Sequence, residues 1–318
     1  MRLLVTGGCG FIGSNFIRYM LGKYKSCKVV NLDKLTYCGR RENLKDIEKD
    51  RRYRFIKGDI CNEPLVNRLT RSCDAILNFA ASTHVDRSII DASDFIRTNV
   101  DGVRVLLESA RKNKVRRVIQ ISTDEAYGSI KRGSFKETSL LHPNSPYAAS
   151  KAGGDHLAMA YYTTFKTPVI ITRSSNNFGP YQFPEKVIPL FITNLLENKK
   201  VPLYGDGMNV RDWLYVLDNC RAIDTVLRKG RPGEIYNIGG GYEIPNIKLT
   251  RAILKLVGKT SSMIKYVPDR LGHDRRYSID STKIRKLGWR PAKHFNTAIK
   301  ETVEWYENNK TWWKKIKC

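Results

Sequence analysis

Apolar and polar positions along the first half of the chain form blocks of two kinds. Short aliphatic runs have the length of buried strands, and longer stretches between them place apolar residues at helical spacing. The strand-like runs are residues 3–5, 28–33, 53–57, 74–79, 115–122 and 168–172, and the helical stretches are 11–22, 93–113 and 147–165. Because strands alternate with helices, the pattern predicts an α/β fold with a doubly wound parallel sheet of the Rossmann type and right-handed crossovers.

The pattern changes after the last of these strands. Residues 173–180 are polar and rich in turn formers, and the segments beyond them are shorter and less regular. We therefore expect residues 1–176 to form the Rossmann domain, with later segments returning to its sheet. Residues 177–318 are expected to form mainly a smaller, mixed C-terminal domain that binds the substrate.

Composition agrees with a globular protein, since the 318 residues are 41% hydrophobic and 27% charged. No run approaches the ~18 apolar residues of a membrane span. The chain opens directly on a strand, so we expect no signal peptide, no membrane partner and a cytoplasmic setting. The seven cysteines form no C-x-x-C pair, and neither His84 nor His273 has a second ligand at metal spacing, so no metal site is expected.

The formal net charge of +25 is the unusual bulk property. A basic surface can bind nucleic acid, but the basic residues are spread along the chain, with the densest cluster at residues 310–317. A positive field also attracts small anionic substrates and cofactors. We therefore expect no nucleic-acid partner, and a basic nucleic-acid-binding protein that retains the fold stands as the non-enzyme alternative.

A glycine-rich turn follows the first strand. Gly7, Gly10 and Gly13 lie between that strand and a helix, and Asp33 ends the second strand. Glycines alone are weak signals because turns use them for steric reasons, but this context predicts a dinucleotide site with backbone N–H groups at the pyrophosphate. Asp33 would accept hydrogen bonds from the adenosine ribose and repel a 2′-phosphate, which favours NAD over NADP. The neighbouring Lys34 is the one feature that weakens this preference, and NAD is the expected cofactor.

The ends of the next strands extend the same site. Asp59 follows the third strand and has a carboxylate that could reach the adenine, and residues 80–84 begin with small side chains that let the backbone pass close to a flat cofactor. The fifth strand ends in Ser-Thr-Asp-Glu at 122–125. Because buried unpaired charge is expensive, we expect this acid pair to act chemically at the carboxyl edge of the sheet, where open α/β folds bind ligands.

Tyr147 and Lys151 are four residues apart at the start of a helix and therefore share one face. In isolation, an ordinary surface pair is the simpler interpretation. Beside a dinucleotide fold, Lys151 and a cationic nicotinamide can both lower the phenol pKa from its usual ~10, which would make Tyr147 a base near neutrality.

Cationic side chains recur beside turn residues in the second half of the chain. The candidates are Lys186, Arg211, Arg270, Arg275 and Arg276. Arginine forks suit diphosphate oxygens, but ion pairs with the neighbouring Asp212, Asp269 and Asp274 explain the arginines equally well. Asn246 opens a helix, where it could be a simple N-cap, and His273 is expected to order its loop.

Together these motifs resemble the extended short-chain dehydrogenase/reductase superfamily and, within it, the nucleotide-sugar 4,6-dehydratases of the dTDP-glucose type. The resemblance covers nearly the whole chain. Its stretches are T-G-G-x-G-F-I-G at 6–13, L-D-K-L-T-Y at 32–37, G-D-I at 58–60, T-H-V-D-R-S at 83–88, S-T-D-E at 122–125, Y-x-x-x-K at 147–151, S-N-N-x-G-P-Y-Q-F-P-E-K at 175–186, Y-G-D-G at 204–207, R-D-W-L-Y at 211–215, Y-N-I-G-G at 236–240 and D-R-x-G-H-D-R-R-Y at 269–277. Related epimerases and decarboxylases share the Tyr/Lys pair but lack the acid pair, so Thr-Asp-Glu is the most specific match.

The resemblance implies NAD-dependent dehydration of a nucleoside-diphosphate glucose to the 4-keto-6-deoxy sugar. Tyr147 would take the proton of the C4 hydroxyl, held by Thr123, while hydride leaves C4 for NAD, and Lys151 would bind ribose and tune Tyr147. Glu125 would remove the C5 proton, and protonated Asp124 would protonate the departing C6 hydroxyl. Hydride would then return to C6 and a proton to C5. Dehydration or 4-epimerisation of a UDP-sugar is the alternative within the superfamily.

The resemblance also implies which residues bind the two ligands. Cofactor contacts are expected at Gly7, Gly10, Phe11, Ile12, Gly13, Asp33, Lys34, Leu35, Thr36, Asp59, Ile60, Phe79, Ala80, Ala81, Thr98, Tyr147, Lys151 and Asn177. Substrate contacts are expected at Thr83, Thr123, Asn176, Lys186, Val187, Pro202, Leu203, Tyr204, Arg211, Asn246, Arg270 and His273.

Two departures from the family pattern bear on sugar and base specificity and not on the reaction class. Ser82 stands where members often carry a larger or acidic residue, and Leu271 replaces a usual proline. The family is typically dimeric through two helices per subunit. The corresponding stretches here are 93–113 and 147–165, so the resemblance implies a homodimer.

Overall fold

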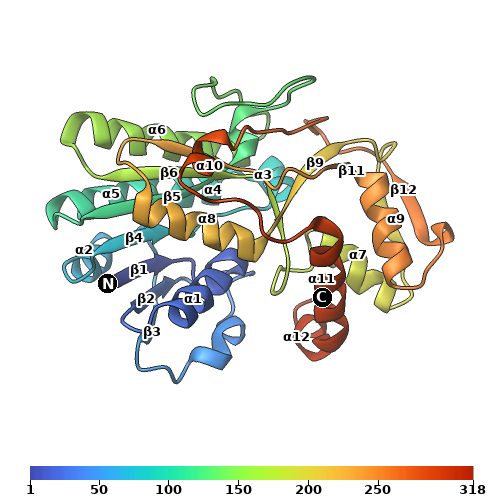
Figure 1. Cartoon of the computed structure of the whole chain (residues 1–318), viewed down its shortest axis with the longest axis horizontal. Helices are drawn as coiled ribbons and strands as arrows, with labels where there is room; N and C mark the ends of the chain where they lie inside the picture. The colour runs from blue at the N-terminus through green and yellow to red at the C-terminus, as the bar shows by residue number, and fades with distance from the viewer. Residues whose placement is uncertain (318) are drawn as a thin grey trace.

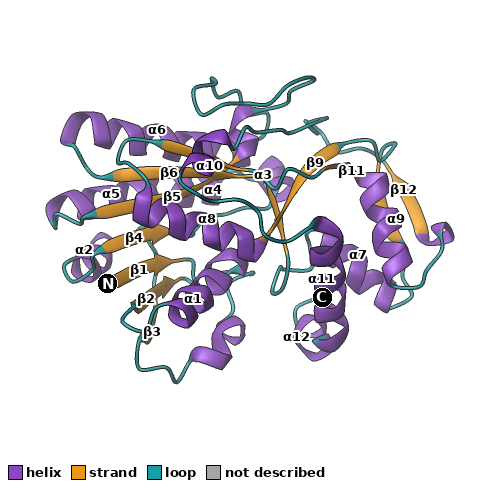
Figure 2. Cartoon of the chain, viewed as in Figure 1, coloured by secondary structure: helices purple, strands orange, loops and turns teal. Residues whose placement is uncertain are grey.

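A seven-stranded, all-parallel sheet forms the centre of the larger of two lobes in the computed structural model, which describes residues 1–317 (Figures 1 and 2). Its strand order is β10-β6-β5-β4-β1-β2-β3. The strands are β1 (Arg2–Thr6), β2 (Lys28–Asp33), β3 (Tyr53–Lys57), β4 (Ala75–Asn78), β5 (Arg117–Thr123), β6 (Val169–Ser174) and β10 (Ile235–Ile238). The predicted doubly wound parallel sheet is confirmed.

Helices cover both faces of this sheet because alternate residues of each strand point to opposite sides. On one face, Leu3 and Val5 of β1 pack in a core with residues of α1 (Phe11–Lys23) and α8 (Val216–Lys229). On the other face, Leu4 belongs to a second core formed with α2 (Glu63–Thr70), α5 (Gly102–Lys112) and α6 (Pro146–Phe165). Near-continuous aliphatic strands are the expected sequence signature of a sheet buried on both faces.

The smaller lobe has one mixed sheet, as predicted, and one parallel strand pair. β7 (Asn176–Phe178), β9 (Val210–Tyr215) and β11 (Glu243–Pro245) form one sheet, and β8 (Val201–Tyr204) pairs with β12 (Ile264–Val267) in another. The helices of this lobe are α7 (Val187–Leu196), α9 (Asn246–Leu256), α11 (Phe295–Asn308) and α12 (Lys310–Lys314). Their shared core is rich in buried aromatic side chains, among them Phe178, Trp213, Tyr306 and Trp313. α8 and β10 return to the larger lobe after the smaller sheet has begun.

The predicted helix over 93–113 is not continuous. α4 (Ser93–Ile96) leads into a π-helical turn at Arg97–Asp101, and only then does α5 begin. Within the turn, the buried Asn99 side chain accepts from Ser82 N at 3.0 Å and donates to Ser82 O and to Ser150 Oγ. These tertiary hydrogen bonds favour the wider turn, which the local apolar spacing does not reveal.

The remaining helical segments are short. They are α3 (Val85–Ile90), α10 (Thr282–Lys286) and the 3₁₀ turns Arg41–Ile47, Asp124–Tyr127 and Ser261–Met263. No helix within residues 1–317 is both long and apolar enough to cross a membrane. Across the same residues the six cysteines are free thiols, and no group of three or more candidate ligands could hold a metal ion. Cys318 lies outside the described residues.

Candidate active site

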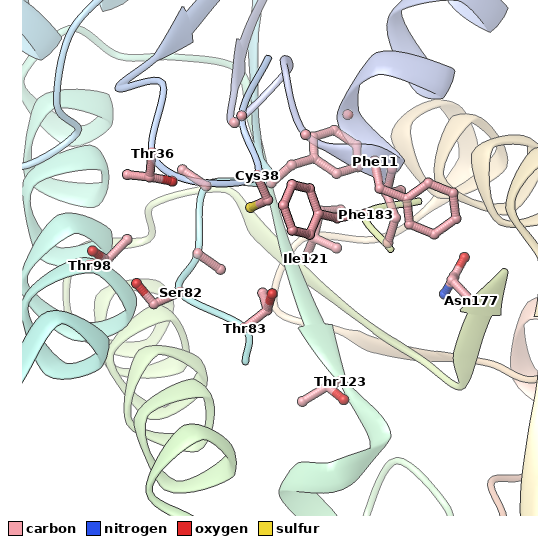
Figure 3. A pocket seen from close by; sticks show the side chains of 18 of the residues that line it. Phe11, Thr36, Cys38, Ser82, Thr83, Thr98, Ile121, Thr123, Asn177 and Phe183 are labelled. Atoms are coloured by element: carbon pink, nitrogen blue, oxygen red, sulfur yellow. The ribbon is translucent and has the colours of Figure 1, made fainter. Parts of the chain in front are cut away.

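A pocket opens at the carboxyl edge of the large sheet, where the strands of an α/β fold present their ligand-binding loops. Residues that follow β1, β2, β3, β4, β5 and β6 all line it, together with residues of the smaller lobe. In Figure 3, Phe11 and Thr123 from the larger lobe and Asn177 and Phe183 from the smaller lobe face the same space. The pocket therefore lies between the two lobes.

The glycine turn leaves no room for side chains at two of its positions. Gly7 has φ of 68°, and a Cβ there would lie 2.6 Å from Ala80 N. A Cβ on Gly13 would lie 2.5 Å from the backbone oxygen of Gly7. This close packing leaves the first N–H groups of α1 unobstructed at the pocket wall, in an arrangement that suits a pyrophosphate.

Asp33 is the buried carboxylate at the end of β2. Its Oδ2 accepts from Cys9 N and its Oδ1 from Leu35 N, each at 2.8 Å, and burial raises its pKa. Lys34, the next residue, pairs with Asp59 across the pocket edge, with 3.0 Å between Nζ and Oδ2. A carboxylate fixed beside the glycine turn suits ribose hydroxyls, so the residues present fit NAD.

The acid pair occupies the end of β5, where Thr123 caps a short 3₁₀ turn by accepting from Glu125 N at 3.3 Å. Asp124 is 2% exposed, and its Oδ2 has no hydrogen-bond partner within residues 1–317. Burial, with the charges of Glu125 and Asp212, raises the pKa of Asp124 well above its usual range. Burial and the neighbouring negative charges thus favour the protonated form of Asp124 at the pocket.

The surroundings of Glu125 are different. Burial raises its pKa as well, but the positive charges of Lys186, Arg211 and Arg270 oppose that rise. Those cations favour the ionised form of Glu125, whereas the strongest effect on the pKa of Asp124 after burial is the negative charge of Glu125 itself. The environments of the two neighbouring carboxyls therefore differ, and they favour the proton on Asp124 over Glu125.

Tyr147 and Lys151 lie in the first turns of α6, which starts at Pro146 after Ser145 accepts from Ala148 N at 3.1 Å. Both side chains are buried and both line the pocket. Burial lowers the pKa of Lys151 to about 8. Burial and the charge of Glu125 raise the pKa of Tyr147, although a hydrogen bond with Thr123 opposes the rise. In the chain without the cofactor, burial sets the direction of the Tyr147 pKa, so the predicted lowering depends on the cationic nicotinamide and stays a prediction.

Most of the sequence-predicted cofactor residues line this one pocket. Those brought together are Gly7, Gly10, Phe11, Ile12, Gly13, Asp33, Lys34, Thr36, Asp59, Ile60, Phe79, Ala80, Ala81, Thr98, Tyr147, Lys151 and Asn177. Leu35 is not among the lining residues. Its backbone N–H binds Asp33, and its side chain packs against the core beneath α1.

The predicted substrate residues divide into two groups. The pocket is lined by Thr83, Thr123, Asn176 and Lys186. Lys186 Nζ donates to the backbone oxygen of Thr83 at 2.9 Å. The others lie beyond its lining: Val187, Pro202, Leu203, Tyr204, Arg211, Asn246, Arg270 and His273. Arg211 and Arg270 still act on the pocket through their charge, because both oppose the pKa rise of Glu125.

Several polar atoms on this side of the pocket have no partner within residues 1–317. They are Asn176 Oδ1, Asn177 Oδ1, Asn246 Oδ1 and Arg270 Nε, all buried. Pro245 precedes α9 as its N-cap and Asn246 is the first helical residue, with no capping hydrogen bond, so the N-cap interpretation is wrong. Buried polar atoms without partners are uncommon in folded proteins, and a polar ligand would satisfy them.

The arginines of the 269–277 loop form ion pairs with acids from other segments. Arg275 pairs with Asp206 at 2.8 Å and Arg276 with Glu243 at 2.7 Å, so both are ion-pair residues, though with different partners from those predicted. His273 Nδ1 lies 2.6 Å from Asp269 Oδ1, which agrees with its expected role in ordering the loop.

Sequence reasoning missed part of the pocket wall. The additional lining residues are Leu32, Cys38, Gly39, Gly58, Ser82, Ile121, Ser122, Ser174, Ser175, Gln182, Phe183 and Glu185. Most are sequence neighbours of predicted residues. Glu185 is the informative case, because its carboxylate accepts from Tyr37 of the larger lobe at 2.8 Å, and nothing local signals that contact.

Comparison with known proteins matches this geometry over the full chain. The family model for GDP-mannose 4,6 dehydratase matches residues 4–302. A dTDP-glucose 4,6-dehydratase of Streptomyces niveus is 52% identical, with 100% of this chain and 96% of the relative covered. The crystal structure of DesIV, a dTDP-glucose 4,6-dehydratase from Streptomyces venezuelae solved with NAD, superposes with a TM-score of 0.98 at 53% identity, covering 100% of both chains.

A more distant structural neighbour shows how far the architecture extends. The UDP-glucose 4-epimerase of Thermus thermophilus, in complex with NAD, has a TM-score of 0.90 at 31% identity and covers 97% of this chain and 100% of its own. The fold is thus shared with epimerases, whereas the higher identity lies with the dehydratases. The chain belongs to the GDP-mannose 4,6 dehydratase family, within the extended short-chain dehydrogenase/reductase superfamily.

Proposed function

We propose that the protein is an NAD-dependent hydro-lyase that converts dTDP-glucose to the 4-keto-6-deoxy sugar with loss of water. The single observation that carries the proposal is the adjacent acid pair at the pocket, in which Glu125 raises the pKa of Asp124 and three cations oppose the rise at Glu125. Elimination of water needs one acid and one base on the same substrate. The relatives named as dTDP-glucose 4,6-dehydratases support the choice of sugar nucleotide.

The chain's own residues would hold NAD along the glycine turn, Asp33 and the end of β4. When bound there, NAD would supply the hydride acceptor for C4 oxidation and the hydride donor for the later reduction at C6. Tyr147 would accept the proton of the C4 hydroxyl, which Thr123 positions from the end of β5. Because the buried phenol of Tyr147 holds its proton tightly in the chain alone, a nearby positive charge must lower its pKa before it can act.

The elimination step would then use the acid pair. Once C4 is a ketone the C5 hydrogen becomes acidic, and Glu125 would remove it as a proton. Asp124 would donate its proton to the departing C6 hydroxyl, so that one water leaves. Lys186, which is anchored on Thr83, and Arg211 would keep Glu125 ionised between turnovers. Arg211, Asn246 and Arg270 would bind the sugar nucleotide from the smaller lobe.

A direct assay tests the proposal. The purified protein is incubated separately with dTDP-glucose and UDP-glucose, and the products are weighed by mass spectrometry. Loss of one water from dTDP-glucose is expected, with much slower loss from UDP-glucose. A product of unchanged mass would identify an epimerase, and no reaction with either substrate at high enzyme concentration would overturn the assignment.

We also propose a homodimer in the cytoplasm. The helices that the family uses for dimerisation correspond to the α4–α5 segment and α6, which lie side by side in the larger lobe (Figure 1). The six free thiols among the described residues are typical of a reducing compartment.

A further inference from the structure

Two cations meet one carboxylate at the edge of the cofactor pocket. Asp59 follows β3, and its Oδ2 lies 3.0 Å from Lys34 Nζ and 3.4 Å from Arg97 Nη2. Lys34 follows β2 directly, and Arg97 opens the π-helical turn. The three residues come from separate segments that are adjacent only in the fold. Lys34 and Asp59 line the pocket together with Asp33.

Asp59 is the fixed member of this cluster. Its Oδ1 accepts from Cys61 N at 3.0 Å, and its side chain is only 21% exposed. The Lys34 and Arg97 side chains are 50% and 60% exposed, so burial does not fix either of them and the carboxylate of Asp59 is the group that orients both. Asp59 therefore holds two solvent-exposed cations at the pocket edge.

A phosphate on the adenosine ribose would need a free cation at this edge of the pocket. NAD presents a ribose 2′-hydroxyl to the acid at the end of the second strand, whereas NADP presents a doubly charged phosphate that needs a nearby cation. Asp33 supplies the acid. Lys34 is the nearest cation along the chain, but Asp59 already neutralises it. Asp33 and Asp59 together also give the pocket edge a negative field that repels a phosphate.

We propose that Asp59 determines the selectivity for NAD over NADP by keeping Lys34 and Arg97 engaged. In the sequence, Asp33 followed directly by Lys34 is compatible with either NAD or NADP. In the fold, Asp59 after the neighbouring strand β3 engages Lys34 and so favours NAD. The inference rests on NAD as the resident cofactor. It concerns cofactor binding alone and is tested without turnover.

The test compares three full-length variants with the wild-type chain. Asp59→Asn removes the charge but keeps an oxygen that can accept from Cys61 N. Asp59→Asn with Lys34→Met also removes the released lysine. Asp101→Asn is the matched control, because Asp101 pairs with Arg104 at 2.7 Å in the same π-helical turn and does not line the pocket. Dissociation constants for NADH and NADPH are measured by nucleotide fluorescence.

The wild-type chain is expected to bind NADH at least a hundredfold more tightly than NADPH. Asp59→Asn should reduce this preference at least tenfold by tightening NADPH, the double variant should restore most of it, and Asp101→Asn should leave it unchanged. An unchanged preference in Asp59→Asn, or a gain that survives in the double variant, would overturn the proposal. Equal wild-type affinities would overturn it without touching the dehydratase assignment, whereas failure to bind either nucleotide would remove the cofactor assignment as well.

Discussion

The ammonium group of Lys151 donates to the backbone oxygen of Ile121, 2.7 Å away, at the buried end of β5. The hydrogen bond fixes the lysine beneath the catalytic edge of the sheet, but it does not supply a counter-charge. Burial consequently lowers the pKa of Lys151 to about 8, and only the charge of Asp155 opposes that change. A folded chain at neutral pH therefore bears the cost of a charged, desolvated lysine.

Lys151→Met is expected to stabilise the fold at pH 7 while destroying activity. A pKa of about 8 in place of 10.5 corresponds to about 3 kcal/mol, and loss of the bond to Ile121 returns about 1 kcal/mol, so a net gain of about 2 kcal/mol is expected. Urea unfolding of the variant and the wild-type chain measures this difference in the free energy of unfolding.

The pH dependence of that gain identifies its origin. Between about pH 8 and pH 10.5 the unfolded chain binds the Lys151 proton and the folded chain does not, so wild-type stability rises with pH in this window. The advantage of Lys151→Met should be complete below pH 8 and disappear by pH 10.5. Two results would show that burial of charge is not the cause. One is a Lys151→Met variant less stable than wild type at pH 7, and the other is the same gain in stability at pH 7 and at pH 10.5.

A matched pair of glycines in α1 tests the cofactor cradle. Gly13→Ala places a Cβ 2.5 Å from the Gly7 oxygen, whereas Gly22→Ala in the same helix meets nothing within 4 Å. Gly13→Ala should weaken NAD binding at least tenfold and cost about 1–3 kcal/mol of stability. Gly22→Ala should leave NAD binding unchanged and add about 0.5–1 kcal/mol. Calorimetric titration measures the affinity for NAD, and thermal unfolding measures the stability. Equal NAD affinities in the two variants would contradict the close contact at Gly13.

Local patterns predicted the strands of the large sheet well. The runs at 28–33 and 53–57 coincide with β2 and β3 residue for residue. β2 is mostly buried and reads as an apolar run, whereas the edge strand β3 is only half-buried and is marked by its aromatic and β-branched residues. The interruption of the helix over 93–113 could not be read in this way, because it depends on hydrogen bonds from Asn99 to residues far along the chain.

In the candidate site, too, the local motifs were predictable and the contacts between distant segments were not. The glycine turn, the acid pair and the Tyr/Lys pair are contiguous motifs, and all of them line one pocket. Contacts across the lobes were not predictable, as with the bond between Tyr37 and Glu185. The effect of burial on the pKa of Tyr147 was not predictable for a related reason. A helix spacing indicates that Lys151 is near, but it does not measure how completely the fold excludes water from the phenol.

Single charges on the proposed dimer helices should separate the subunits. Ile96 on α4 and Phe165 at the end of α6 are 51% and 50% exposed, so both apolar side chains are accessible to a second subunit at these helices. Ile96→Glu and Phe165→Glu are expected to convert a dimer to a monomer in light scattering. Tyr266→Glu is the control, since Tyr266 is 59% exposed on β12 of the other lobe. A wild-type monomer, or dissociation by Tyr266→Glu alone, would contradict the proposed interface.

Asp124→Asn and Glu125→Gln should stop the same reaction at different places. Asp124→Asn removes the acid that protonates the departing hydroxyl, so water loss should fall about 10²–10⁴-fold while oxidation at C4 continues and NADH absorbance accumulates. Glu125 remains, so C5 of the sugar should still exchange with deuterium from D₂O. In Glu125→Gln, NADH should also accumulate, but exchange at C5 should fall by a similar factor because the base is gone. If Asp124→Asn prevented NADH formation, or if both variants exchanged C5 equally, the division of labour inferred from the unequal pair would be wrong.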